Sequence, residues 1–301
     1  MIKAIQQTGW KALHWGSQTN HNRILSCGFL VGICYLIRWL GSAWEILIQG
    51  DELLFLSLGL LAYGGSTAWQ QRTTLSTLRA TQEEAFVGHS LILGGMTAFI
   101  VLNSSRSLLT LAWDVTLFGM IYSHWGIACL RKYPIALLTL FLGFYPSLSF
   151  LTSTTWQVLT PHNLLENAMA RMGCIMLRAM GEPATYEGPF LSLPTGSIEI
   201  KTGCNGLRMA VTIALGSLLL GLFLKQRRRT ILYCMAIGIA LALAFNVPRL
   251  ALMALAVAYW GKDSFDFWHG PWGGQIFSAI VFTIYYYITV GLLDKKSNPQ
   301  T

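Results

Sequence analysis

Eight apolar runs, each about long enough to cross a lipid bilayer as a helix, constrain this chain more than any other feature of its sequence. A membrane-spanning helix needs about 20 predominantly apolar residues. Only 11% of the 301 residues are charged, whereas a soluble domain averages roughly 25%. We therefore expect an all-α integral membrane protein that forms a single domain over residues 1–301, with about eight transmembrane helices. The runs cover residues 24–40, 52–69, 86–102, 107–128, 133–151, 205–224, 230–258 and 272–293.

The basic residues between these runs predict how the helices are oriented. Lys and Arg are retained on the cytoplasmic side of a membrane, and they gather after every second run, as in the cluster 225–229 after the sixth. Arg38 and Arg106 are exceptions. We expect cytoplasmic N- and C-termini, with residues 1–23 as a cytoplasmic N-terminal segment. The net charge of +8 then reflects topology, and we expect no nucleic-acid partner because the basic residues form no single stripe.

One long segment, residues 152–203, separates the fifth and sixth runs on the predicted outer face. Its first half has the spacing of a helix with two faces. The apolar face is predicted to contain Leu165, Ala168, Met172 and Ile175. The other face is predicted to contain Asn163, Asn167, Arg171, Cys174 and Arg178. We expect this helix to lie on the membrane surface or to pack over the bundle. The second half predicts a β-hairpin, with strands around 189–193 and 198–201 joined by a turn at 194–197.

Cys204 lies between two glycines where the hairpin leads into the sixth run. We expect the helix to begin at Asn205 and to place Arg208 on the same face as the thiol. A helix N-terminus and a nearby cation both favour a thiolate. The alternative is an inert, buried thiol, as expected for most of the six cysteines, whose spacing supports neither a disulfide framework nor a zinc site. We expect no metal and no cofactor.

Arg249 is the second candidate. About 28 Å of helix from Thr230 to Arg249 carries this arginine back to the outer boundary of the membrane. An arginine inside an apolar run is costly and indicates a functional site. Asn246 and Pro248 beside it indicate a polar pocket, because Pro248 frees a backbone carbonyl. Snorkelling to lipid headgroups or a structural ion pair are the alternatives.

His269 is the third candidate. It lies in a predicted outer loop, residues 261–271, just before the last run. A loop or interface role is the alternative for this residue. His89 and His124 lie within apolar runs, where we expect polar packing, since a proton relay would need partners that the sequence does not identify. A thiol, a guanidinium and an imidazole at one depth indicate acyl transfer, with a nucleophile, an oxyanion stabiliser and a proton carrier.

These residues resemble the exosortase and archaeosortase family of membrane cysteine transpeptidases, and most of all its cyanobacterial branch. Cys204-Asn205-Gly206-Leu207-Arg208 resembles the family's Cys-Ser-Gly-(Leu/Ile)-Arg pattern, with Asn205 in place of the commoner Ser. Asn246 and Arg249 match its Asn-x-x-Arg motif, and His269 stands where the family places its histidine. The resemblance covers roughly residues 150–293 and implies that Cys204, Arg249 and His269 are catalytic, within the catalytic helices 204–293. Arg208, Asn246 and Asn205 would support the site or bind substrate.

The resemblance also implies a substrate. It implies cleavage of exported proteins at a C-terminal sorting tail, which combines a Pro-Glu-Pro-like motif, one transmembrane helix and basic residues. Cleavage would leave an acyl thioester on the cysteine, at the outer face of the plasma membrane. Membrane lipid and an accessory membrane protein are further expected partners.

Two other classes of function remain open from the sequence. A multi-span transporter or channel could use Arg208 and Arg249 as substrate contacts, although the chain shows no inverted repeat and no buried charge on several helices. A non-catalytic assembly scaffold is the third possibility.

Overall fold

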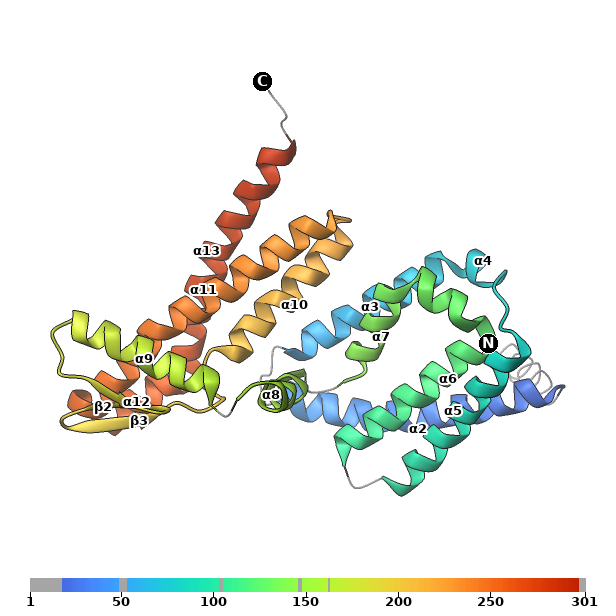
Figure 1. The fold of residues 1–301 in the computed structure, drawn as a ribbon, viewed down its shortest axis with the longest axis horizontal. Coiled ribbons are helices and arrows are strands. Elements are labelled where there is room, and N and C mark those ends of the chain that lie inside the picture. The colour runs from blue at the N-terminus through green and yellow to red at the C-terminus, as the bar shows by residue number, and fades with distance from the viewer. Residues whose placement is uncertain (1–17, 49–52, 103–104, 146–147, 162, 298–301) are drawn as a thin grey trace. The chain divides into compact units, whose positions relative to one another are not determined.

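A computed structural model of the chain describes residues 18–48, 53–102, 105–145, 148–161 and 163–297 (Figure 1). The described residues are mostly helical and form two compact units, Met1–Leu148 and Ser149–Thr301. Of the predicted cytoplasmic segment 1–23, residues 1–17 lie outside the described residues. The single integral membrane domain stays a prediction.

The N-terminal unit is built from helices that approach one another closely through glycines. A Cβ on Gly88 of α5 would lie 2.5 Å from Ser123 of α6, and one on Gly64 of α3 would lie 2.5 Å from Leu140 of α7. Small residues of this kind let helix backbones pack tightly in a membrane. The unit comprises α2 (Asn20–Ile48), α3 (Leu53–Gln70), α4 (Arg72–Leu75), α5 (Gln82–Val101), α6 (Arg106–Lys132) and α7 (Pro134–Gly143).

A short turn joins α4 to α5 and is fixed by Glu84. Thr81 and Glu84 form a capping box at the start of α5, and Glu84 Oε1 also accepts the backbone N–H of Ile127 at 3.0 Å. That second bond is possible because α6 is kinked at Gly126, whose φ of 66° suits glycine. The start of α5 is therefore held against the kink of α6.

Three histidines from separate helices meet in this unit. His21 of α2 places Nδ1 2.8 Å from His89 Nε2 and Nε2 3.4 Å from His124 Nδ1. The rings of His21 and His124 are stacked, with centroids 5.7 Å apart. His21 is thus the partner of both His89 and His124, which the sequence did not identify. Within the described part of the chain, no three His, Cys, Asp or Glu side chains are arranged to hold a metal ion.

The C-terminal unit carries the segment between the fifth and sixth apolar runs and the last helices. Its helices are α8 (Leu148–Leu159), α9 (Leu164–Ala179), α10 (Leu207–Phe223), α11 (Arg228–Leu255), a π-helical turn η1 (Ala256–Trp260), α12 (Lys262–His269) and α13 (Pro271–Ser297). A three-stranded antiparallel sheet in the order β1-β2-β3 lies between α9 and α10, with β1 (Thr185–Glu187), β2 (Phe190–Leu193) and β3 (Gly196–Glu199).

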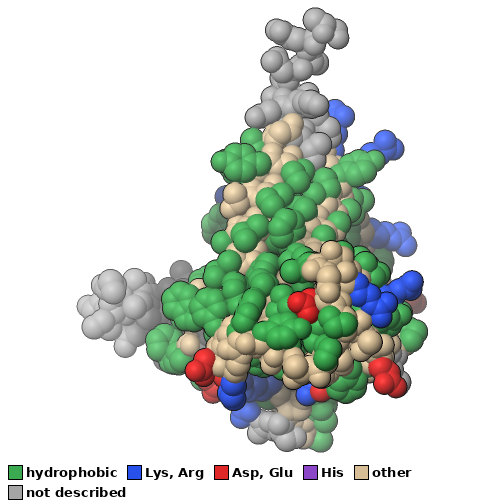
Figure 2. Space-filling view, turned by 90° about the vertical axis from the view of Figure 1, so that its left-hand side faces the viewer, with side chains coloured by type: hydrophobic (Ala, Val, Ile, Leu, Met, Phe, Trp, Pro, Cys, Tyr) green, Lys and Arg blue, Asp and Glu red, His purple; other side chains and the backbone are tan. Residues whose placement is uncertain are grey.

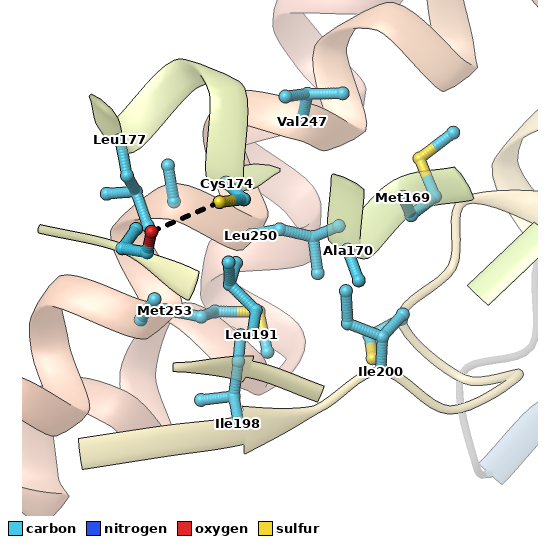
Figure 3. Packing of buried hydrophobic residues seen from close by; sticks show 14 of the residues in the cluster. Met169, Ala170, Cys174, Leu177, Leu191, Ile198, Ile200, Val247, Leu250 and Met253 are labelled. Carbon is cyan, nitrogen blue, oxygen red and sulfur yellow. Dashed lines mark hydrogen bonds between the residues drawn. The ribbon is translucent and has the colours of Figure 1, made fainter. Parts of the chain in front are cut away.

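The core of this unit joins α9, the sheet and α11. Leu177 of α9, Leu191 of β2 and Leu250 of α11 are each fully buried in one cluster. Figure 3 shows side chains from these three elements pointing toward one another. Because β3 leads into the Cys204 turn and Leu250 is next to Arg249, this core fixes the frame of the candidate site.

Four helices among the described residues are long and apolar enough to cross a membrane: α2, α5, α11 with η1, and α13. A fifth is added if α6 and α7, which meet at a bend of 116°, count as one broken span. Figure 2 shows hydrophobic side chains over most of the face it displays, with acidic side chains in its lower half. A multi-pass membrane protein is confirmed, whereas the number of eight spans and their orientation stay predictions.

Three local predictions need correction. The fifth apolar run, 133–151, is not one helix, because α7 ends at Gly143 and α8 begins at Leu148. The predicted hairpin is present as β2 and β3, but β1 extends it to three strands. The apolar face predicted for α9 packs on the core only at Leu165.

In α9, the helix turns a different face to the core. Ala168, Met172 and Ile175 are exposed, and Cys174 is buried. The buried face contains small residues that allow close contact with β2 and α11, and a Cβ on Gly173 would lie 2.9 Å from Leu191. Its members are Leu165, Glu166, Met169, Ala170, Gly173, Cys174 and Leu177.

Candidate functional site

Cys204 lies in the turn between β3 and α10. Its side chain is 2% exposed. The sulfur accepts the backbone N–H of Lys201 at 3.3 Å, and the thiol in turn donates to the Lys201 carbonyl at 3.4 Å. The helix does not begin at Asn205 as predicted but at Leu207, with Gly206 as its N-cap. Cys204 therefore precedes the helix by a short turn, and the predicted shared helical face with Arg208 is wrong.

Gly206 is required by this turn. Its φ is 85°, in the left-handed region, where a residue with a Cβ costs roughly 1–2 kcal/mol. A Cβ there would also lie 3.1 Å from Cβ of Asn246 on α11. Gly206 thus allows the chain to change direction before α10 and allows α11 to pack closely against the turn.

Asn205 ties the same turn to α9. Its Oδ1 accepts the backbone N–H of Leu207, the first residue of α10, at 2.9 Å. Its Nδ2 donates to Oε1 of Glu166 at 2.9 Å. Asn205 is fully buried and Glu166 is 7% exposed, so water does not compete for these bonds.

Asn246 ties the turn to α11. Its Nδ2 donates to the Cys204 carbonyl at 2.9 Å, and the side chain is fully buried. Its Oδ1 is also buried, without a hydrogen-bond partner among the described residues. A buried acceptor without a partner is costly, and such atoms are found where a protein binds a further group.

Arg249 lies one helical turn after Asn246 and holds the end of α12. Its Nε donates to the Trp268 carbonyl at 3.3 Å, and its Nη2 donates to the His269 carbonyl at 3.0 Å. The last carbonyls of a helix lack internal partners, and a cation there is favourable. The predicted loop 261–271 is therefore mostly the helix α12, and Arg249 caps it.

His269 is the last residue of α12. Its side chain is exposed, and its ring stacks on Phe265 one turn earlier, with centroids 5.2 Å apart and planes at 8°. Among the described residues, no hydrogen bond joins its imidazole to the Cys204 thiol. The structure connects His269 to the site through its carbonyl and Arg249.

The electrostatics of the thiol differ from the sequence prediction. Burial raises the pKa of the Cys204 thiol above its ordinary value. The N–H of Lys201 and the charges of Arg249 and Lys201 act in the opposite direction, and the Glu166 carboxylate adds to the rise. The predicted thiolate is thus not the favoured form of the buried thiol. The arginine that acts on it is Arg249, because Arg208 is an exposed residue on the first turn of α10.

Glu166 is the residue of this network that sequence reasoning missed. It is the acidic residue in the first turn of α9, a helix whose polar residues were assigned to another face. A usable signal was present, since Ala170 and Gly173 follow Glu166 by one and two turns. Small residues in line with a carboxylate indicate a face that packs closely and buries the acid.

The sequence as a whole matches one protein family. The family model described as transmembrane exosortase matches residues 44–286. No curated protein and no solved structure matches the chain. Since the match covers most of the sequence and includes every residue of the Cys204 network, the chain belongs to the transmembrane exosortases, a family of membrane sorting transpeptidases.

Proposed function

We propose that this chain is a membrane-embedded cysteine protease or transpeptidase that cleaves the C-terminal sorting tail of exported proteins, with Cys204 as nucleophile. The observation that supports this most is the placement of Asn246 and Arg249 one turn apart on α11. The first binds the turn that carries the thiol, and the second binds the end of the helix that carries His269. One helix thus contacts the backbone at both groups that acyl transfer needs.

The reaction assigned to these residues has two halves. The Cys204 sulfur attacks the scissile carbonyl, a C–S bond forms, and the carbonyl oxygen becomes an oxyanion near the charge of Arg249. The thiol proton passes to His269, which then donates it to the leaving amine of the tail as the C–N bond breaks. A second nucleophile attacks the thioester and transfers its proton to the imidazole. The C–S bond then breaks, and the imidazolium returns that proton to the Cys204 thiolate.

The buried thiol sets a condition on the first step. Cys204 is 2% exposed, so a substrate carbonyl reaches its sulfur only when the turn at 201–206 shifts. Burial also keeps the thiol protonated until then. Substrate binding and thiolate formation would therefore occur together, which limits side reactions of the free enzyme.

The proposed substrates carry a Pro-Glu-Pro-like motif, one transmembrane helix and basic residues at the C-terminus. Such a tail can dock laterally in the membrane and present its motif at the outer face of the plasma membrane, where we place Cys204. Membership of the cyanobacterial branch is part of the same proposal. It follows from the resemblance of the motifs around Cys204 and Arg249.

Trapping of a covalent acyl-enzyme tests this function. The full chain in membranes is mixed with a protein that ends in such a tail, and mass spectrometry should find the substrate's acyl group on Cys204. Cys204→Ala should abolish cleavage, and Cys204→Ser should lower it by about 10³-fold or more, as for the loss of a nucleophile. Undiminished cleavage in both variants would show that Cys204 is not the nucleophile.

A further inference from the structure

A buried carboxylate lies beside the thiol turn in a part of the chain that carries no motif residue. Glu166 of α9 is 7% exposed and accepts Nδ2 of Asn205 at 2.9 Å. Ionised side chains are rarely buried unless a specific contact requires them. Here the contact is with the residue next to Cys204.

With the Glu166 contact, the turn is hydrogen-bonded to a helix on each of two sides. Asn246 of α11 holds the Cys204 carbonyl, and Glu166 of α9 holds the Asn205 amide, which in turn accepts the N–H of Leu207. Both helices contribute to the same hydrophobic core. The backbone of residues 204–207 is therefore fixed between two helices that pack directly against each other.

We propose that Glu166 is a positioning residue of the Cys204 site, whose carboxylate holds the thiol turn closed through the amide of Asn205. The proposal rests on the proposed function in one respect only, which is that Cys204 in this turn is the nucleophile. Glu166 contributes in two separable ways, as a hydrogen-bond acceptor and as a negative charge.

The two contributions have different consequences for the thiol. Loss of the acceptor releases Asn205 and opens the turn, so that the thiol becomes accessible. Loss of the charge alone removes an influence that raises the pKa of Cys204. Glu166→Gln keeps an oxygen that can accept from Asn205 and removes the charge, whereas Glu166→Ala removes both.

Alkylation of the full chain by iodoacetamide, followed peptide by peptide with mass spectrometry from pH 6 to 11, separates these effects. The high-pH rate, taken on the plateau where it no longer rises with pH, reports accessibility, and the midpoint of the rise reports the ionisation of the thiol. We expect Glu166→Ala to raise the high-pH rate at Cys204 by 10-fold or more. Glu166→Gln should leave that rate within about twofold and move the midpoint to lower pH.

Two cysteines in the same chain serve as internal controls. Cys174 is 1% exposed and lies on α9, the helix that carries Glu166. If Glu166→Ala merely unfolded this region, Cys174 and Cys204 would become reactive together, which would overturn the proposal. Cys34 lies on the candidate membrane span α2, where alkylation should be slow and should proceed at the same rate in every variant. Glu187→Gln, which removes an exposed carboxylate on β1, is the matched substitution without effect.

A double-mutant cycle tests the route through Asn205. In the Asn205→Ala background the turn has already lost its tie to α9, so Glu166→Ala should add less than twofold to the high-pH rate. A full 10-fold increase in that background would show that Glu166 does not act through Asn205, and the proposal would be wrong.

The alkylation measurements need no substrate, so they remain decisive whatever the reaction is. If no acyl-enzyme forms at Cys204 but Glu166→Ala still opens the turn as expected, the proposed function fails and the positioning role stands. If an acyl-enzyme forms and the Glu166 variants alkylate like the unchanged protein, the role of Glu166 fails and the function stands.

Discussion

Each of the two units of this chain contains a polar cluster in an apolar setting, and these two clusters are built differently. In the N-terminal unit, His21, His89 and His124 of α2, α5 and α6 contact one another through their side chains. In the C-terminal unit, Asn246 and Arg249 reach backbone carbonyls at a turn and at a helix end.

This difference has a physical consequence. A bond between two imidazoles can form with either ring as donor, and both rings can adjust, so such a cluster joins helices without fixing an exact backbone. A side chain that binds backbone carbonyls where a helix begins or ends fixes the path of the chain itself. Positions of that kind suit a site whose reacting atoms must be held closely in place.

Among substitutions that test this comparison, the largest effect is expected for Arg249. Arg249→Lys replaces a planar fork that reaches two carbonyls by a single point donor. Loss of one charge-assisted bond costs about 1.5–3 kcal/mol, so cleavage of a tail-bearing substrate should fall by roughly 10- to 150-fold at the tenfold-per-1.36 kcal/mol scale. Single-turnover cleavage assays measure this loss.

Arg208→Lys is the matched control for that change. Arg208 is exposed on α10, and its charge is retained in the variant, so we expect less than about threefold loss, in keeping with a surface substitution. Equal and negligible effects of both substitutions would mean that Arg249 neither orders α12 nor stabilises the oxyanion.

Gly206 offers the second test, because it shows whether the backbone conformation of the Cys204 turn is required. Gly206→Ala forces a Cβ into a left-handed residue at about 1–2 kcal/mol, and the new atom would contact Asn246. We expect the free energy of unfolding in detergent to fall by about 2 kcal/mol and cleavage to fall with it. Chemical denaturation with a fluorescence readout measures the first quantity.

Gly203→Ala provides the comparison for Gly206 within the same turn. A Cβ at Gly203 would meet no atom within 4 Å, so its effect on stability should stay below about 0.5 kcal/mol. A loss at Gly203 as large as at Gly206 would show that the turn tolerates no side chain anywhere, and that the left-handed φ is not the cause.

Much of this architecture follows from hydrophobic spacing. The apolar runs predicted a helical membrane protein, and the turn signals predicted β2 and β3, because both depend on local sequence. The motif around Cys204 and the Asn246–Arg249 spacing predicted that these residues lie together, and Asn246 does contact the Cys204 carbonyl. The local sequence pattern did not predict which hydrogen bonds fix those residues in place.

The misses share a cause, which is tertiary packing. The face of α9 was wrong because close contact with β2 favours small residues over large apolar ones, and Glu166 was missed for the same reason. The thiol was predicted to ionise from its place near a helix end, but burial by the surrounding core outweighs that influence. The link from His21 to His89 and His124 joins positions 68 and 103 residues apart, beyond any periodic signal.

A smaller effect is expected in the N-terminal unit. His21→Ala removes both imidazole contacts of α2, each worth about 1 kcal/mol, so thermal unfolding of the purified chain should occur a few degrees lower. In that background, His89→Ala should add little, because its partner is already gone. Additive losses from the two changes would show that the histidines stabilise the helices separately and do not form one cluster.

The smallest effect is expected in the pH dependence of stability that Cys204 causes. Because the folded pKa of this thiol is raised, the unfolded chain loses the proton first, above the ordinary value of about 8.5. Stability is thus fully present below that pH and falls as pH rises toward the folded pKa, with a slope of at most about 1.4 kcal/mol per pH unit. Denaturation at pH 7 to 10 should show a steeper decline for the unchanged protein than for Cys204→Ser, whose hydroxyl does not titrate in this range. Equal slopes would mean that the turn already opens in the folded chain and lets the thiol ionise there, and the C-terminal cluster would then be no more fixed than the three histidines.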